Sequence, residues 1–401
     1  MRKRVVVTGI GILCSLGKSY PEVIDAVQKG TYGGGTITGF STEGYKMSKA
    51  CVVNELPQEI KNCTEIEDAN KYALYCAERS IRDSGISLCE YAPERIGVCL
   101  ASSNAGEISR ELYRHTETSD GQNGVIVETP ATLTGLIASE IHAEGPRISV
   151  STACAAGGNS IGYAFDLIRN DKCDVVLSGG IDPMSKLSYS GFLILNTISS
   201  EPVRPFDATR KGIDLGEAGV VFVMESLDSA LKRGAHIYCE ILGYGISNDA
   251  YHTSAPDPEG QGAKAAMEQC LAVARLRAED VDYINAHGTG TRYNDEMELK
   301  AVSSVFGEHA KKIPISSSKS MHGHALSAAG SLELAVTIGA IERNFVPITI
   351  TTENVMDEYR DYSIVTEKNK GKYKNYVIDV ALSNSFGFAG NNTCLAVGRY
   401  Q

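Results

Sequence analysis

Short apolar runs that alternate with longer helical patterns are the feature that most limits how this chain can fold. The runs lie at residues 5–7, 96–100, 148–150, 175–177, 220–224, 237–241, 281–284, 313–315 and 377–382. They lack the polar alternation of a half-exposed strand, so we expect strands that are buried on both faces. Helical patterns fall between them, at residues 72–84, 155–170, 262–276 and 327–343. Strands that alternate with helices of this length predict βαβ units in an α/β protein.

No low-complexity linker divides the 401 residues, and no sequence repeat is visible. A chain of this length suits two or three domains or one large α/β body. A second strand-led series begins near residues 243–248, and the best seam therefore lies there. We expect an N-terminal part at residues 1–245 and a C-terminal part at residues 246–401.

The composition excludes several classes of protein. Hydrophobic residues make up 43% of the chain, which is too many for a disordered protein. The net charge of −11 disfavours general nucleic-acid binding. No apolar stretch approaches the roughly 20 residues that a membrane span needs. Thr8 interrupts the first apolar run, which is typical of a buried strand and not of a secretory signal. The 11 cysteines are scattered without a C-x-x-C pair, which indicates a reduced, cytoplasmic protein with mostly buried thiols.

Cys154 stands where an expected strand, residues 147–151, turns directly into an expected helix. Small residues follow it, as close packing of the strand against the helix requires. A thiol at a helix N-terminus feels the positive end of the helix dipole, which favours the thiolate. The pattern therefore predicts a nucleophile on a sharp turn. A buried structural cysteine, as expected for most of the others, is the alternative.

Two histidine loops also follow expected strands. His287 lies in the stretch Asn285-Ala286-His287-Gly288-Thr289-Gly290-Thr291, and His324 ends the stretch Ser316-Ser317-Ser318-Lys319-Ser320-Met321-His322-Gly323-His324. The pair His322 and His324 is a weak metal motif, because no acidic residue or cysteine stands nearby in sequence to complete a site. We expect no metal. Two such loops together with a cysteine on a turn favour nucleophilic catalysis over a structural role.

Phe386 and Phe388 alternate with glycine in a loop that follows the expected strand at residues 377–382. The functional interpretation is a backbone N–H donor and an aromatic gate beside the thiol, whereas the alternative is a packed turn. Near the N-terminus, five residues separate Gly11 from Gly17, where a phosphate-binding loop needs four. We therefore expect neither a nucleotide nor another cofactor.

Taken in chain order, these motifs resemble the β-ketoacyl-acyl carrier protein synthases, of the elongating synthase I/II type and the related type II polyketide ketosynthases. The resemblance covers essentially the whole chain and includes residues 5–11, 204–207 and 215–219. It implies a thiolase-like fold of two similar βα halves in a five-layered αβαβα arrangement, usually dimeric. The first half, residues 1–245, would carry the nucleophile, and the second, residues 246–401, both catalytic histidines.

The resemblance also implies a role for each motif residue. Cys154 would accept the acyl group, and His287 and His324 would form the decarboxylation pair. The remaining expected roles are an oxyanion hole from the N–H groups of Cys154 and Phe388, a gate at Phe386 and Phe388, substrate binding by Thr289 and Thr291, a loop lysine at Lys319, and acidic partners at Asp295 and Glu298. Glu298 would support Lys319 in an ion pair.

Three stretches depart from the family pattern. Asn104 stands where an apolar residue usually lines the acyl pocket, and Ala389 and Asn391 replace a glycine and a threonine in the last motif. Residues 64–68 are largely acidic where many members carry an Arg-Lys pair against their acidic carrier protein. Carrier docking could then move to basic residues elsewhere, for which an ordinary solvated surface is the alternative: Arg204, Arg210 and Lys211.

Several functions remain open on the sequence alone. The first is an elongating ketosynthase that acts on acyl carrier protein thioesters as a homodimer. The second is a catalytic subunit that works only in a heterodimer with a chain-length-factor-like subunit. A non-catalytic partner subunit would lack the nucleophile, and a degradative thiolase would use a second cysteine as its base. The intact Cys154 and the two histidine loops favour the first two.

Overall fold

Ten strands form one sheet in the computed structural model, which describes residues 2–61, 67–116 and 129–401. The strand order is β10-β9-β11-β12-β8-β1-β7-β6-β4-β5. The strands of the first half are β1 (Val5–Cys14), β4 (Ile96–Ala101), β5 (Arg147–Val150), β6 (Val175–Asp182) and β7 (Ala218–Ser226). Those of the second half are β8 (Cys239–Asn248), β9 (Tyr283–Asn285), β10 (Ile315–Ser316), β11 (Val380–Gly387) and β12 (Asn391–Gly398).

The two halves of the sheet have the same topology. Outward from the centre, the first half runs β1-β7-β6-β4-β5 and the second β8-β12-β11-β9-β10. In each half the first two pairings are antiparallel and the last two are parallel. The halves join where Val5–Val7 of β1 pair with Cys239–Ile241 of β8. This duplication confirms the expected pair of similar βα halves, although the sequence contains no visible repeat.

The expected seam at residue 245 falls inside β8. That strand belongs wholly to the second half, because it pairs along its length with β12. The connection between α8 (Leu227–Lys232) and β8 is where the chain passes from one half to the other.

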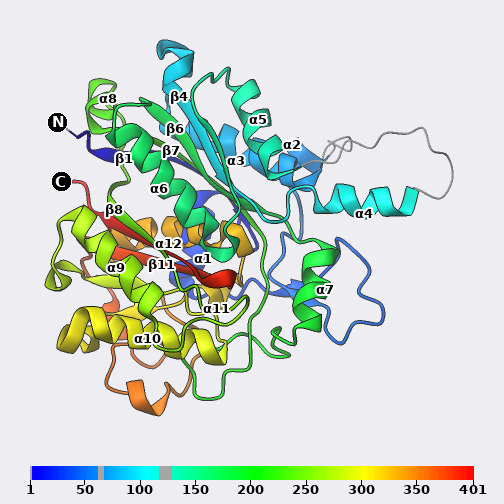
Figure 1. Cartoon of the computed structure of the whole chain (residues 1–401), viewed down its shortest axis with the longest axis vertical. Helices are drawn as coiled ribbons and strands as arrows, with labels where there is room; N and C mark the ends of the chain where they lie inside the picture. Colours follow the sequence, from blue (N-terminus) through cyan, green and yellow to red (C-terminus); the bar gives the residue numbers. More distant parts are fainter. Residues whose placement is uncertain (1, 62–66, 117–128) are drawn as a thin grey trace.

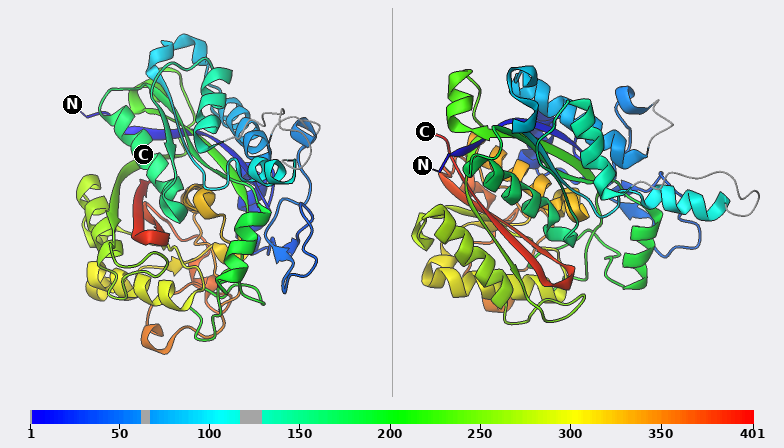
Figure 2. Two further views of the ribbon diagram at one scale, coloured as in Figure 1. Left: turned by 45° about the vertical axis from the view of Figure 1, so that its right-hand side comes forward. Right: turned by 45° about the horizontal axis from the view of Figure 1, so that its top comes forward.

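Helices cover the sheet in layers (Figures 1 and 2). The central helices α6 (Ala156–Arg169) and α12 (Ala329–Arg343) pack against each other and against strands of both halves. The outer layer of the first half contains α3 (Asp68–Ser84) and α5 (Pro130–Glu140), and that of the second half contains α9 (Gln261–Ala274) and α10 (Arg292–Phe306). The two halves of the sheet thus act as two β layers, with α6 and α12 between them and one layer of helices outside each half. This is the expected five-layered αβαβα arrangement.

Shorter elements complete the description. They are α1 (Tyr20–Lys29), which packs on α12, the hairpin of β2 (Gly35–Thr36) and β3 (Lys49–Ala50), α2 (Gln58–Lys61), α4 (Glu107–Thr116), α7 (Lys186–Ile194) and α11 (Lys319–His322). Helices α4 and α7 contact each other and project from the same side of the molecule (Figure 1). Within the described ranges no helix is long and apolar enough to span a bilayer.

Small residues in α6 allow this central helix to pass close to its neighbours. A Cβ atom on Gly157 would lie 2.6 Å from the Ser327 carbonyl oxygen, and one on Gly158 would lie 2.8 Å from the Thr393 methyl group. Both distances are shorter than real Cβ contacts, so the helix tolerates only glycine there. This close approach brings the start of α6, and with it Cys154, against the loops of the second half.

Candidate active site

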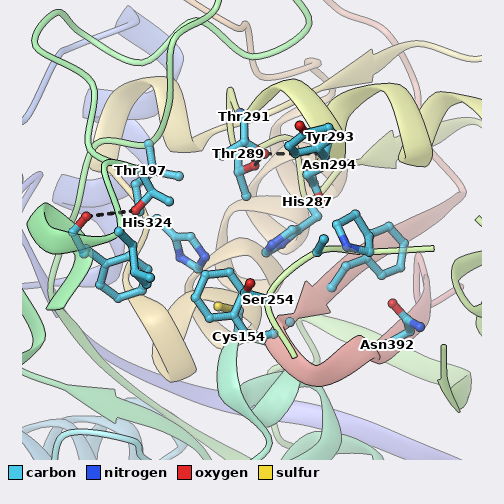
Figure 3. A pocket seen from close by; sticks show the side chains of 18 of the residues that line it. Cys154, Thr197, Ser254, His287, Thr289, Thr291, Tyr293, Asn294, His324 and Asn392 are labelled. Carbon is cyan, nitrogen blue, oxygen red and sulfur yellow. Dashed lines mark hydrogen bonds between the residues drawn. The ribbon is translucent and has the colours of Figure 1, made fainter. Parts of the chain in front are cut away.

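Cys154, His287 and His324 lie together at one cavity of about 250 Å³ (Figure 3). The cysteine comes from the first half of the fold and both histidines come from the second half. Phe386, Phe388, Thr289 and Thr291, which the sequence predicted as gate and substrate-binding residues, also line the cavity. The fold thus brings four separate sequence motifs to one place.

The turn that carries Cys154 is strained. After β5, Ala153 adopts a left-handed backbone with φ of 49°, and residues Ala153–Ala155 form a 3₁₀ turn before α6 begins. A left-handed conformation costs a residue other than glycine roughly 1–3 kcal/mol. The Ser327 hydroxyl donates to the Ala153 carbonyl over 3.3 Å and helps to hold this turn from the opposite half.

Burial raises the pKa of the Cys154 thiol to about 12. The positive charge of Lys319 lowers this pKa, as do the backbone N–H groups of Phe388 and Cys154, but the loss of solvent is the larger effect. The preference for thiolate expected from the helix dipole is therefore wrong for the resting site, because Cys154 is only 7% exposed and burial outweighs the groups that lower its pKa. The two N–H groups that face the sulfur are those expected to form the oxyanion hole.

The two histidines are fixed as the same tautomer. Nδ1 of His287 lies 3.2 Å from Nζ of Lys319, and Nδ1 of His324 accepts the backbone N–H of Leu326 over 3.1 Å. Because an amine and an amide donate in these contacts, each ring carries its proton on Nε2. The ring centroids are 5.3 Å apart and the planes meet at 85°.

Both imidazoles are neutral. Burial lowers the pKa of His287 and of His324 well below the usual range, and the charge of Lys319 lowers each pKa further. A neutral ring with its proton on Nε2 can donate one hydrogen bond into the cavity and keeps no net charge. The site therefore offers a thiol and two neutral donors side by side.

Lys319 forms its ion pair with Glu333 of α12, and the pairing with Glu298 expected from the sequence is wrong. Lys319 is the first residue of α11, and both Lys319 and Glu333 are buried. Burial raises the pKa of Glu333 to about 7, while Lys319 lowers it. A single carboxylate in the otherwise apolar central part of the expected helix at residues 327–343 was the signal that could have identified this partner.

Glu298 and Asp295 instead hold the His287 loop by its backbone. Glu298 accepts the N–H groups of His287 and Gly288, each over 2.8 Å. Asp295 accepts the N–H of Gly290 over 3.1 Å. Burial raises the pKa of both carboxyl groups, that of Glu298 to about 7. These acidic residues position the loop and do not contact the cavity.

The Phe-Gly-Phe turn closes one side of the cavity. The Phe386 ring lies 5.9 Å from the His287 ring, and the Phe388 ring lies 5.8 Å from that of Phe192. A Cβ atom on Gly387 would lie 3.0 Å from the Cys154 nitrogen, so this glycine is what allows the turn to approach the nucleophile. Ala389 adopts φ of 58°, a conformation that the usual glycine would take without strain.

Asn104 is absent from the residues that line this cavity. It is buried, and its side chain is satisfied by the Pro183 carbonyl at 2.9 Å and the Ser188 hydroxyl at 2.6 Å. Asn391 donates to the Phe388 carbonyl over 2.9 Å and so braces the gate turn. The two hydroxyls of Thr289 and Thr291 lie 2.9 Å apart on the cavity wall.

Arg210 is unsuited to docking, contrary to the prediction from the sequence. Its side chain is only 7% exposed, and its guanidinium donates to the backbone carbonyls of Asp207, Thr291 and Arg292. This buried set of bonds ties the loop before β7 to the start of α10. Residues 64–66 of the acidic stretch noted in the sequence lie outside the described residues. Of its described carboxylates, Glu67 is buried and accepts the Gly106 N–H and the Ser109 hydroxyl, and Asp68 pairs with Lys71.

The Arg204 and Lys211 side chains, the other two basic residues expected to dock a carrier, are partly exposed and lie near carboxylates. Lys211 pairs with Glu201 over 2.9 Å. Arg204 has Glu201 at 3.9 Å and Glu353 at 3.8 Å.

Sequence reasoning missed the carboxylate of Asp182 at the end of β6. It accepts the Ser102 hydroxyl and three backbone N–H groups, those of Ser103, Asn104 and Ser327. The last of these comes from the other half, beside the His324 loop. The sequence offered only a weak signal, an aspartate that ends an apolar strand after two glycines.

The C-terminal end of α7 and the segment after it were also missed. Phe192, Leu195 and Thr197 line the cavity, although their stretch carries no motif. In the described part of the chain no cluster of His, Cys, Asp and Glu is arranged to hold a metal ion. His322 uses both ring nitrogens in hydrogen bonds, to the Gly323 carbonyl and the Ser318 hydroxyl.

Comparison with known proteins agrees with this geometry. The model of the β-ketoacyl synthase N-terminal domain matches residues 2–230, and that of the C-terminal domain matches residues 238–353. The chain is 35% identical to 3-oxoacyl-[acyl-carrier-protein] synthase 2 of Coxiella burnetii, covering 99% of each, and 36% identical to the Synechocystis protein of that name, covering 100% of this chain and 99% of the relative.

Solved structures with the same fold include the ishigamide ketosynthase/chain length factor, at a TM-score of 0.91 and 32% identity. They also include the ketosynthase AntDE in complex with the type II polyketide acyl-carrier protein AntF, at a TM-score of 0.88 and 29% identity. Each covers 100% of both chains. From its sequence and its thiolase-like fold, with cysteine and histidines in one cavity, this chain belongs to the β-ketoacyl synthase family.

Proposed function

We propose that the chain condenses an acyl group held on Cys154 with a malonyl group on an acyl carrier protein, losing CO₂ and giving a 3-oxoacyl thioester. The observation that carries this proposal is the pair of neutral imidazoles, His287 and His324, each with its proton on Nε2 beside the thiol. An enolate oxygen needs hydrogen-bond donors that do not protonate it, and such rings meet that need.

The first step is transfer of the acyl group to sulfur. The Cys154 sulfur attacks the thioester carbonyl, and the bond from that carbon to the carrier sulfur breaks. The thiol proton leaves with the carrier thiol, so charge balances over the step. The N–H groups of Cys154 and Phe388 stabilise the tetrahedral oxyanion.

The second step is decarboxylation of the malonyl thioester. Its carboxylate leaves as CO₂, and the electron pair of the broken carbon–carbon bond forms an enolate whose oxygen accepts from the two Nε2–H groups. The enolate carbon attacks the acyl carbonyl on Cys154, and the carbon–sulfur bond breaks. The cysteine leaves as thiolate and takes up one proton to restore the resting thiol.

Lys319 acts through its neighbours in this scheme. Its contact with Nδ1 of His287 keeps the proton on Nε2, and its charge lowers the pKa of both rings. Glu333 balances that charge where both side chains are buried. Both residues position and tune the donors, and neither contacts the reacting atoms.

A dimer is part of the proposal. Strand β5 is the last strand on its side of the sheet, and its residues Arg147 and Ser149 are exposed, which leaves an edge able to pair with another chain. A homodimer and a heterodimer with a chain-length-factor-like subunit both suit this edge. The second arrangement is favoured by neighbours described as ketosynthases with chain length factors. The described cysteines are free, which supports a cytoplasmic location.

Alternatives from other classes fit less well. A non-catalytic partner subunit has no use for a buried thiol beside two neutral imidazoles. A degradative thiolase needs a second cysteine as base, and among the described residues that line the cavity Cys154 is the one cysteine.

Intact-mass measurement tests the proposal. The protein is mixed with acyl-carrier thioesters of graded chain length, and then with malonyl-carrier. We expect a mass gain of one acyl group, its loss on addition of malonyl-carrier, and no gain in Cys154→Ala. Loading that persists in Cys154→Ala, or an acyl-enzyme that malonyl-carrier does not discharge, would contradict the proposal.

A further inference from the structure

The mouth of the catalytic cavity carries an exposed apolar surface. Leu195 and Tyr293 line the cavity and are 53% and 69% exposed. Ile194, next to Leu195 at the end of α7, is 78% exposed and does not line the cavity. These three residues, here called the mouth patch, come from the C-terminal end of α7, the residue that follows it, and the start of α10.

The three basic residues that the sequence suggested for carrier docking are already paired or buried. Lys211 is paired with Glu201, Arg204 lies between Glu201 and Glu353, and the Arg210 guanidinium is buried. Arg292, beside Tyr293, is exposed and has no ion pair within the described residues. Of the four basic residues compared, Arg292 is thus the one that offers an acidic partner a free positive charge, on a chain whose own net charge is −11.

The nucleophile can be reached only by a long arm. Cys154 is almost completely buried at the inner end of the cavity, so a thioester has to enter through the mouth while the protein that carries it remains outside. That protein must rest on the surface around the opening. In a solved neighbour an acyl-carrier protein is bound to its ketosynthase.

We infer that the mouth patch is the surface on which the acyl carrier protein docks, through apolar contact and with Arg292 as its electrostatic contact. This inference rests on the proposed function, because it takes a carrier-borne thioester as the substrate. The contact differs from charge-steered docking on a basic patch, since apolar burial is insensitive to salt whereas exposed ion pairs are screened.

The first experiment compares a carrier-borne donor with a small one. Wild type and Ile194→Glu are loaded at Cys154 from an acyl-N-acetylcysteamine thioester and from the same acyl group on the acyl carrier protein of Synechocystis. Ile194 is outside the cavity, so we expect unchanged loading from the small thioester. We expect the half-saturating concentration of the acyl-carrier donor to rise about tenfold or more, since a charge would replace an apolar contact.

Leu231→Glu is the matched control. Leu231 is 54% exposed on α8, which lies at the opposite end of the molecule from α7 (Figure 1). It should load from both donors as the wild type does. Equal loading of Ile194→Glu and Leu231→Glu from the acyl-carrier donor would overturn the inference. It would also be overturned if the wild-type protein loaded from the small thioester but not from the acyl-carrier donor. Failure of wild type to load from either donor would refute the proposed function itself.

The second experiment measures how carrier loading depends on salt and whether the oligomeric mass changes. Between about 50 and 500 mM NaCl, we expect the half-saturating carrier concentration for wild type to change less than about threefold. A steep loss of carrier affinity with salt would show that charges dominate and would overturn the inference. Light scattering of Ile194→Glu should match that of wild type, and a change of oligomeric mass would assign the patch to an interface between chains instead.

Discussion

At the scale of single residues, the site depends on which atom carries each proton. Lys319 and the Leu326 amide fix the two imidazoles from behind, so that Nε2–H of each faces the cavity. Cys154 keeps its proton because burial outweighs the groups that lower its pKa. Neutral donors and a resting thiol suit a reaction in which negative charge appears only during the chemical steps.

Loss of one imidazole donor should separate the two half-reactions. In His324→Ala we expect acyl loading of Cys154 to persist and condensation to fall about 10²–10³-fold, since one oxyanion donor contributes about 2.7–4 kcal/mol. Mass measurement of the acyl-enzyme checks the loading step, and the rate of CO₂ release checks the condensation step. The control is His236→Ala, an exposed histidine outside the site. Condensation at the wild-type rate in His324→Ala would contradict the assigned role.

The raised pKa of Cys154 predicts a steep dependence of its reactivity on pH. Because thiolate is the nucleophile and the thiol pKa is about 12, alkylation of Cys154 by iodoacetamide should still rise about tenfold per pH unit from pH 8 to pH 10. Lys319→Met removes a charge that lowers this pKa, so it should slow alkylation throughout the range. Peptide mass mapping reads Cys154 separately from Cys89, which is exposed and serves as internal reference. A plateau below pH 9 would contradict the burial effect.

At the scale of elements, the central helices decide where the chemistry lies. Helix α6 starts at the nucleophile, and α12 carries the carboxylate that balances Lys319. The two pack against each other between the halves of the sheet. Motifs from distant parts of the sequence therefore meet only if these helices approach closely, and glycines on α6 make that approach possible.

Adding one methyl group to α6 should disturb this contact. In Gly157→Ala the new Cβ would meet the Ser327 carbonyl at 2.6 Å and the Ser331 hydroxyl at 2.8 Å. We expect a loss of roughly 1–3 kcal/mol in the free energy of unfolding, measured by urea denaturation.

Gly135→Ala in α5 is the matched control, because a Cβ there meets nothing within 4 Å. It should stabilise the protein by about 0.5–1 kcal/mol, the helix preference for alanine over glycine. Equal effects of the two substitutions would show that space around α6 is not what requires glycine.

At the scale of the whole molecule, the sequence predicted the α/β class and the site motifs but not their connections. Strand runs and the turn at Cys154 are local patterns, so they were visible in the sequence. The pairing of Lys319 with Glu333 and the acceptor role of Asp182 depend on elements that meet only in the folded chain. The duplicated topology was expected only from the family resemblance, because it lies in strand order and not in a visible sequence repeat.

Charged groups and hydrogen bonds, as well as apolar helices, hold the two halves of the fold together. Asp182, at the end of β6, binds the N–H of Ser327 in the other half. Ser327 in turn donates to the Ala153 carbonyl beside the nucleophile. The nucleophile turn is thus held through a path that crosses from the first half to the second and back.

Removal of the Asp182 carboxylate should weaken both the fold and the site. Asp182→Ala leaves the Ser102 hydroxyl and the N–H groups of Ser103, Asn104 and Ser327 without their acceptor in a fully buried place. Since each unsatisfied buried donor costs about 1–3 kcal/mol, we expect the free energy of unfolding to fall by roughly 3 kcal/mol or more. Acyl loading of Cys154 should slow as well, because Ser327 no longer braces the turn at Ala153.

Asp25→Ala provides the comparison for that substitution. Asp25 also joins distant segments, through an ion pair with Arg343, but it is mostly exposed. Exposed pairs contribute about 0–1 kcal/mol, so urea denaturation should show a small change and loading should match wild type. If Asp182→Ala behaved like Asp25→Ala in both measurements, the link between the halves would not run through Asp182. If it lost stability and kept wild-type loading, Asp182 would support the fold without positioning the nucleophile.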